Sequence, residues 1–190
     1  EIVNGRTTDT NSGFLAQLLR AAGVEVVGFQ AVPDDRDGIV QALQRGLQDA
    51  PLVVTTGGLG PTADDLTTAC VGEVVGRPLE LDPASLAIIE ERFRSRGIEM
   101  PPNNRKQAML PSIAEMLDNP VGTACGFALD IGKARFFFTP GVPRELRRML
   151  EEQILPRLLA RSGNPTTIHL KRFHSYGLGE SHVDALLEGV

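Results

Sequence analysis

One stretch of the chain decides its fold, and it reads LVVTTGGLGPTADD at residues 52–65. The apolar run at 52–54 does not alternate with polar residues, which is typical of a parallel strand covered by helices on both faces. Gly57, Gly58 and Gly60 then let backbone N–H groups approach an anion without a Cβ in the way, and the helix expected next offers its positive end. This order of strand, glycine loop and helix predicts a site for a phosphate-bearing ligand, with Thr56 and Thr62 as further hydroxyl donors.

Two aspartates at the end of the loop change its chemistry. The carboxylates of Asp64 and Asp65 would repel a phosphate unless a cation lay between them, and Mg²⁺-like ions prefer carboxylate and phosphate oxygens. We therefore expect a divalent metal ion held by Asp64 and Asp65, with the alternative that Thr62 and Asp65 form a helix capping box. Asp34 follows an earlier expected strand at the same sheet edge and is a candidate third carboxylate or base. Its alternative role is that of a turn or helix-capping residue.

Two more polar segments are candidates for ligand contact. Residues 139–145, TPGVPRE, again join an apolar strand to a helix, and Arg144 with Gly141 suits a second phosphate, although proline at a helix start is also common. Asn103, Asn104 and Gln107 offer amide groups suited to sugar hydroxyls or a base edge, or form a polar surface turn. The candidate ligand-binding positions from the residues alone are Thr56, Gly57, Gly58, Gly60, Thr62, Asn103, Asn104, Gln107, Gly141, Val142, Pro143 and Arg144.

Strand and helix patterns alternate along the rest of the chain. Helical spacing is found after residue 10, after Pro33, over residues 66–75 and 83–96, and in a long helix through Leu146, Leu150, Ile154 and Leu158. Short strands are expected at 24–29 and 52–54, and 127–131 with 134–138 form an antiparallel hairpin. This alternation predicts an α/β fold of three layers, with an open, mostly parallel sheet and helices on both faces.

Composition limits the partners. The 190 residues suffice for one sizeable domain and part of another, and the net charge of −5 argues against nucleic acid, whose binding relies on clustered Lys and Arg. No apolar run approaches the ~20 residues that cross a membrane, and no signal sequence is evident, so we expect a cytosolic location and no membrane partner. The chain starts without methionine and stops inside an apparent helix, so we expect both ends to be cut. Cys70 and Cys125 are expected to be free thiols. His169, His174 and His182 are expected to be surface or packing residues.

Several motifs together resemble the N-terminal domain of the CinA family. They are TTGGLGPT at 55–62, DDLT at 64–67, PNN at 102–104, QA at 107–108, GTA at 122–124 and PGVP at 140–143. The resemblance implies a molybdopterin-binding-like domain at 1–160 without its first strand, a linker at 161–166, and the truncated start of a small α+β domain at 167–190. In that superfamily acidic positions correspond to Asp65 and Asp34, and an Asn that opens the first helix corresponds to Asn11, which joins the candidate ligand contacts.

The resemblance also implies a function. CinA domains of this kind are associated with metal-dependent hydrolysis of the pyrophosphate of ADP-ribose, so we expect an enzyme in which Asp64 and Asp65 hold the ion and Asp34 orients water. One alternative is molybdopterin binding or adenylyl transfer in molybdenum cofactor biosynthesis, and another is a non-catalytic nucleotide-sensing module. Related folds form dimers or trimers, which implies a homo-oligomer.

Overall fold

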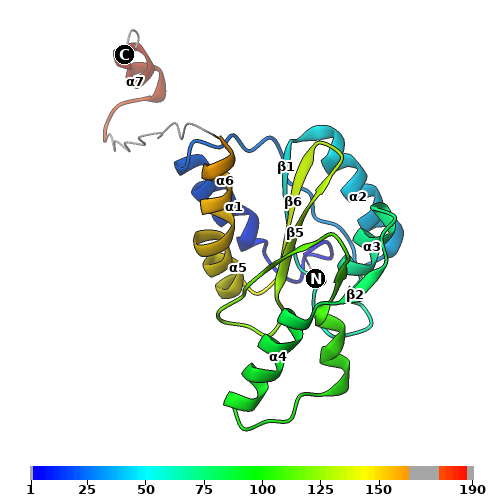
Figure 1. Cartoon of the computed structure of the whole chain (residues 1–190). Helices are drawn as coiled ribbons and strands as arrows, with labels where there is room; N and C mark the ends of the chain where they lie inside the picture. The colour runs from blue at the N-terminus through cyan, green and yellow to red at the C-terminus, as the bar shows by residue number, and fades with distance from the viewer. Residues whose placement is uncertain (1, 163–175, 188–190) are drawn as a thin grey trace.

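The centre of the fold is a four-stranded sheet in the order β1-β6-β5-β4 (Figure 1). A computed structural model describes residues 2–162 and 176–187 of the chain. The strands are β1 (Leu52–Thr56), β4 (Glu115–Leu117), β5 (Gly126–Ile131) and β6 (Ala134–Thr139). β1 and β6 run parallel, whereas β5 is antiparallel to both β6 and β4. The predicted α/β class and the predicted hairpin are confirmed, but the described sheet is mixed and not mostly parallel.

Helices cover both faces of this sheet, so the predicted three layers are present. α2 (Arg36–Asp49) and α3 (Thr67–Val74) lie on one face, and α1 (Thr10–Ala21), α5 (Pro143–Met149) and α6 (Leu155–Ser162) lie on the other (Figure 1). Side chains alternate along β6, so Phe136 and Phe138 pack toward α2 and α3 while Phe137 packs toward the other layer. All three rings are fully buried, and each burial contributes roughly 1.5–3 kcal/mol.

The strand expected at residues 24–29 does not form. Val24 and Val26 pack against the core, while Val27 and Phe29 are exposed. No described strand pairs with the segment, and a strand is defined by hydrogen bonds to a neighbour. The prediction of a strand at 24–29 is therefore wrong.

A smaller unit packs beside one end of the sheet. β2 (Leu79–Leu81) and β3 (Met109–Pro111) pair antiparallel, and α4 (Pro83–Ser95) and the 3-10 helix η1 (Pro102–Ala108) lie between them in sequence. α4 begins where Asp82 Oδ1 accepts a hydrogen bond of 2.7 Å from the Ser85 amide, and Pro83 fixes the first turn. This unit carries residues 103–107 to the glycine loop.

The predicted long helix after β6 forms, with one irregularity. Between α5 and α6 the chain makes a π-helical segment, η2 (Leu150–Ile154). Leu146, Leu150, Ile154 and Leu158 recur every four residues, and in an α-helix each such step would drift by about 40° around the axis. The wider turn of the π segment offsets that drift, so all four side chains stay in the same buried cluster.

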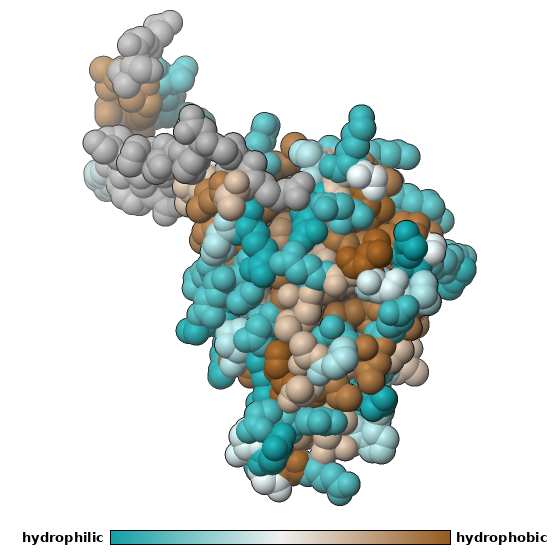
Figure 2. Space-filling model, viewed as in Figure 1, coloured by the Kyte–Doolittle hydropathy of each residue, from teal (hydrophilic) through white to brown (hydrophobic). Residues whose placement is uncertain are grey.

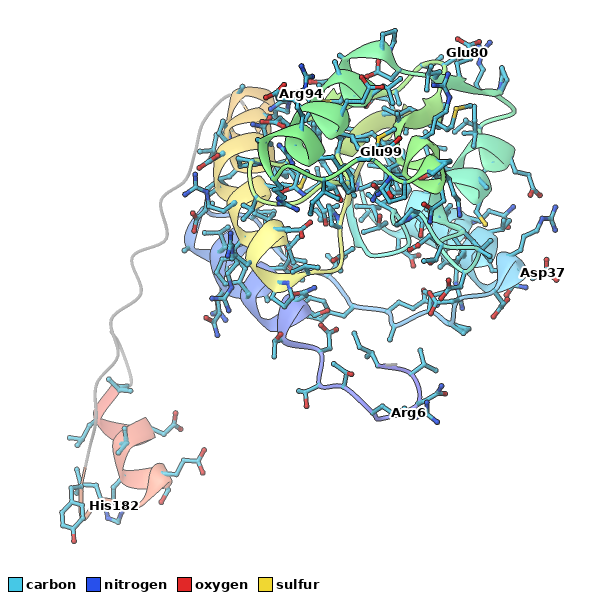
Figure 3. All side chains as sticks on the ribbon, turned by 90° about the horizontal axis from the view of Figure 1, so that it is seen from below. Arg6, Asp37, Glu80, Arg94, Glu99 and His182 are labelled. Atoms are coloured by element: carbon cyan, nitrogen blue, oxygen red, sulfur yellow. The ribbon has the colours of Figure 1, made fainter. Side chains whose placement is uncertain are left out.

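The remaining described parts lie at the surface. The charged side chains of Arg6, Asp37 and Glu80 extend outward at the periphery (Figure 3). Arg94 and Glu99 are also exposed, and hydrophilic residues cover much of the face shown in Figure 2. α7 (Glu180–Leu187) buries none of its residues. Within the described residues, no helix has both the length and the apolar character to span a membrane. His169, His174 and most of the linker predicted at 161–166 lie outside the described residues, and Cys70 and Cys125 are free and buried as predicted.

Candidate functional site

The parallel pairing of β1 and β6 creates the candidate site, because both strands end at the same edge of the sheet. Thr56 lies opposite Thr139, and the Gly57 amide donates a 2.9 Å hydrogen bond to the Thr139 carbonyl. The loops that follow the two strands therefore run side by side and enclose a pocket of about 350 Å³. Its lining residues are Gly57, Gly58, Leu59, Gly60, Asp65, Gln107, Thr123, Ala124, Pro140, Gly141, Val142 and Glu145.

The glycine loop has a shape that only glycine adopts easily. Gly57 and Gly58 have φ values of +102° and +71°, in the left-handed region. A Cβ at Gly58 would lie 2.0 Å from Thr67 Oγ1, and this hydroxyl donates a 3.1 Å hydrogen bond to the Gly57 carbonyl. Among the described residues, nothing accepts a hydrogen bond from the backbone amides of Gly58, Leu59 or Gly60. These amides line the pocket and remain free to bind an anion.

The second loop reaches the first at close range. A Cβ at Gly141 would lie 3.4 Å from the Gly57 Cα, in van der Waals contact with the glycine loop. Asn11 holds this junction from α1, since its Nδ2 donates 2.9 Å to the Gly141 carbonyl and 3.3 Å to Thr56 Oγ1. Thr56 Oγ1 in turn donates to the Pro140 carbonyl over 3.0 Å. Asn11 and Thr56, both predicted as ligand contacts, thus brace the loops behind the pocket.

Asp65 lines the pocket, whereas Asp64 is exposed to solvent beside it. Asp65 Oδ2 accepts hydrogen bonds from the amide of Thr62, over 2.9 Å, and from its hydroxyl. The proposed capping box is wrong, because α3 begins only at Thr67 with no side-chain cap, and the Thr62–Asp65 bonds close a separate turn. Hydrogen bonding from the Thr62 side chain also lowers the pKa of Asp64, and the Lys106 charge adds to this. The Thr62 hydroxyl has one proton and can donate it to only one of the two carboxylates at a time. The Thr62 amide holds Asp65 in place.

Lys106 is a site residue that the sequence did not single out. Its Nζ donates to the carbonyl of Thr62 and, over 2.8 Å, to that of Asp65. The lysine thereby ties η1 to the turn that carries both aspartates. Its position between the PNN motif at 102–104 and the QA motif at 107–108 is its one signal in the sequence.

Residues 103–107 contribute unequally to the site. Gln107 lines the pocket and accepts a 2.9 Å hydrogen bond from Asn104 Nδ2, and both side chains are buried. Asn103 is exposed and does not line the pocket. The amide cluster predicted here therefore supplies one lining residue, one supporting residue and one surface residue.

Asp34 and Arg144 are not part of the pocket lining. Both are exposed, as is Pro143, while the neighbouring Gly141, Val142 and Glu145 do line it. Within residues 2–162 and 176–187, no three His, Cys, Asp or Glu side chains gather as a group able to hold a metal ion. Asp34 is thus not assembled with Asp64 and Asp65 into one ion site.

Glu145 lines another part of the pocket and is held by the buried Asn119, and neither role was predicted from the sequence. Glu145 Oε2 accepts a 2.7 Å hydrogen bond from Asn119 Nδ2, and the same nitrogen donates 2.9 Å to the Ala124 carbonyl. Asn119 Oδ1 accepts from the amides of Val121 and Gly122 at 3.2 and 3.0 Å. The pocket therefore carries free amides on one side and carboxylates from Asp65 and Glu145.

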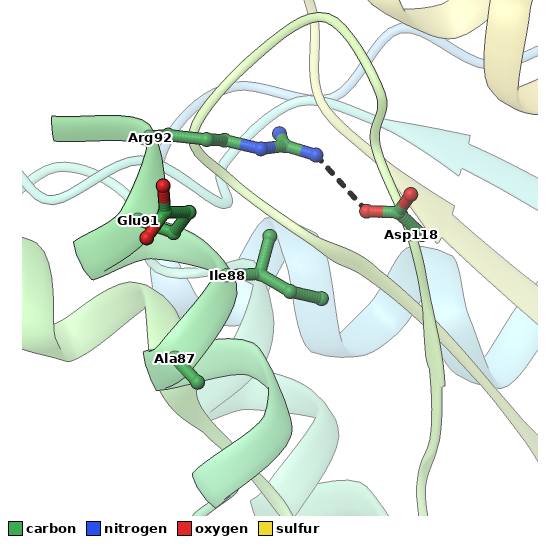
Figure 4. Close-up of a pocket in the computed structure, with 5 residues that line it drawn as sticks. All are labelled: Ala87, Ile88, Glu91, Arg92 and Asp118. Carbon is green, nitrogen blue, oxygen red and sulfur yellow. Dashed lines mark hydrogen bonds and ion pairs between the residues drawn. The ribbon is translucent and has the colours of Figure 1, made fainter. Parts of the chain in front are cut away.

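A second, more open hollow of about 390 Å³ lies between α4 and the end of β4 (Figure 4). Arg92 reaches across it to Asp118 at 3.0 Å, above the side chain of Ile88. None of the residues predicted from the sequence lines it. The ligand site is better assigned to the glycine-loop pocket, where two loops with constrained backbones converge.

Three helix–sheet–helix layers with a glycine loop at the sheet edge define an α/β domain of the molybdopterin-binding-like class. Residues 1–160 match the family described as "Probable molybdopterin binding domain". A CinA protein of Thermoplasma acidophilum has 36% identity and a TM-score of 0.73, over 80% of this chain and 88% of that one. The chain belongs to the CinA family. MoaB of Thermus thermophilus, at 21% identity and a TM-score of 0.55 over 86% and 91% of the two chains, shares the fold.

Curated relatives also show that the chain belongs to the CinA family, and they match it over nearly its whole length. CinA-like proteins of Thermomicrobium roseum and Escherichia coli are 44% and 40% identical over 97% and 99% of this chain. The chain spans about half the length of these relatives, 45% and 47% respectively.

Proposed function

We propose that the glycine-loop pocket binds a small phosphate-bearing molecule of the molybdopterin type. The observation that carries this proposal is the row of unbonded amides at Gly58, Leu59 and Gly60, which face a pocket closed by the 140–142 loop. Amides in such a concavity bind anionic oxygens without any charged side chain. The family description and the shared fold of MoaB support a pterin phosphate as the ligand.

Binding can be measured directly by calorimetry with freshly released molybdopterin under anaerobic conditions. Inorganic pyrophosphate and ADP-ribose serve as comparison ligands that share only the phosphate chemistry. Saturable binding of molybdopterin supports the proposal. Binding of ADP-ribose alone, or of no probe, would refute the pterin assignment.

A second candidate is metal-dependent hydrolysis of the pyrophosphate of ADP-ribose. It is favoured by the carboxylates of Asp65 and Glu145 in one pocket and of Asp64 beside it, because carboxylates and phosphate oxygens are the ligands that Mg²⁺ prefers. The ion would screen the diphosphate charge and activate the attacking water. The protein would hold the diphosphate on the glycine loop, with Asp64 and Asp65 toward the ion, whereas Asp34 lies outside the pocket lining and has no part in this step.

Chromatography of ADP-ribose reactions, with and without Mg²⁺, tests this activity through release of AMP. Asp65→Asn should lower turnover by about a hundredfold, which is typical when an electrostatic catalytic group is lost. The exposed Asp49→Asn is the matched control and should leave turnover unchanged. Metal-independent release, or normal turnover in Asp65→Asn, would contradict the mechanism, and tight binding without turnover would favour a nucleotide-sensing module.

We also propose a cytosolic location and a homo-oligomeric assembly. Light scattering on the purified chain measures the second directly, and a monomer at working concentration would refute it.

A further inference from the structure

We propose that Glu145 is a specificity-determining residue that selects ligands carrying hydrogen-bond donors in addition to the phosphate. The inference rests on the proposed function, in which the glycine loop binds the phosphate. The donors that fit are hydroxyl or amino groups, as on a ribose or a pterin.

The orientation of Asn119 fixes the role of Glu145 as an acceptor. Asn119 is fully buried, and its Oδ1 receives the amides of Val121 and Gly122. The oxygen must therefore face those two donors, which leaves Nδ2 directed at the Ala124 carbonyl and at Glu145 Oε2. Glu145 Oε2 therefore accepts a hydrogen bond from a donor whose orientation is fixed.

The backbone also encloses this carboxylate. A Cβ at Gly122 would lie 2.2 Å from the Glu145 Cδ, so the loop before β5 passes directly over the side chain. The carboxylate is half-buried and lines the pocket beside Thr123 and Ala124. Its position is thus set by the loop on one side and by Asn119 on the other.

The second carboxylate oxygen has no protein donor. Within the described residues, Glu145 Oε2 receives Asn119, but nothing donates to Oε1 and no Lys, Arg or His forms an ion pair with this side chain. A half-buried carboxylate with a free oxygen favours a donor supplied by the ligand. The pocket then offers the glycine loop to an anion and the free oxygen of Glu145 to a donor on the same ligand.

The test compares Glu145→Gln with the exposed Glu151→Gln from the same helical stretch. Calorimetry measures the dissociation constants of molybdopterin, ADP-ribose and inorganic pyrophosphate. Glu145→Gln should weaken the donor-bearing ligand at least about tenfold, as for loss of a hydrogen bond to a charged group. Pyrophosphate has no such donor and should bind equally or more tightly, and Glu151→Gln should change none of the three.

Each result bears on the inference. Weaker binding of molybdopterin or of ADP-ribose by Glu145→Gln supports the role of Glu145, because both ligands carry hydrogen-bond donors that pyrophosphate lacks. Equal weakening of pyrophosphate, or unchanged affinity for every ligand, would overturn it while the proposed function stands. If the unaltered chain binds no probe, the proposed function and this inference both fail. Glu145→Asp, which keeps the charge but shortens the side chain, replaces the glutamine variant if that one melts early.

Discussion

Replacing Gly58 by alanine should destabilise the chain more than the same change at Gly57. Both residues have positive φ, and a side chain in the left-handed region costs about 1–2 kcal/mol. At Gly57 nothing lies within 4 Å of the added Cβ, so backbone strain is the whole cost. At Gly58 the Cβ would lie 2.0 Å from Thr67 Oγ1 and 3.0 Å from Thr67 Cβ.

Thr67 would have to move to admit the new methyl group. Its hydroxyl would then lose the bond to the Gly57 carbonyl, which is worth about 0.5–1.5 kcal/mol. Added to the strain, the expected loss for Gly58→Ala is about 1.5–3.5 kcal/mol of unfolding free energy, against about 1–2 kcal/mol for Gly57→Ala.

Urea denaturation followed by circular dichroism is the suitable assay, because the chain has no Trp and a single Tyr. Combining Gly58→Ala with Thr67→Ala isolates the hydroxyl clash as a coupling energy. The alanine at 58 should cost less in the Thr67→Ala background than in the unaltered chain. Equal losses for the two glycine variants, or no coupling with Thr67, would refute the account of the loop.

Two more predictions concern Lys106, which supports the site, and the buried thiol of Cys125. Lys106→Met should release the turn at 62–65 from η1, because both Lys106 hydrogen bonds to that turn are lost. Amide hydrogen exchange should then speed up at residues 62–65, while exchange in α5 is unaffected. Unchanged exchange would mean that the Lys106 hydrogen bonds do not hold the turn. Burial raises the pKa of the Cys125 thiol from 9.0 to about 11, so the unfolded chain loses this proton first as pH rises. The free energy of unfolding should therefore fall between pH 9 and 11, as measured by denaturant titrations. In Cys125→Ala this fall should be smaller by about 2–3 kcal/mol. An equal fall in both proteins would contradict the prediction.

The parts of the site that depend on neighbours in sequence could be predicted. Gly57 and Gly58 adopt positive φ because the turn after β1 requires it, and Gly132 does the same between β5 and β6. The apolar run at 52–54 and the alternation of strand and helix patterns along the chain similarly predicted the layers. Such features rest on local conformation, which residue types disclose directly.

The missed residues depend on contacts between distant segments. Glu145 meets Asn119 across 26 positions, and Lys106 reaches Thr62 across 44. A glutamate in the first turn of a helix is common, so nothing local marked Glu145 as a pocket residue. Asn11 was selected by resemblance, but its bond to the Gly141 carbonyl, 130 positions away, makes it a brace.

The π segment at η2 has a consequence for comparing chain lengths across the family. The buried positions 146, 150, 154 and 158 would suit an uninterrupted α-helix if one residue were removed between Leu150 and Ile154, since the later side chains would then recur at three- and four-residue intervals. The segment is equivalent to a one-residue insertion that the helix absorbs by widening a single turn. An alignment gap at this point would leave the packing against β5 and β6 intact, and is therefore no sign of a different core.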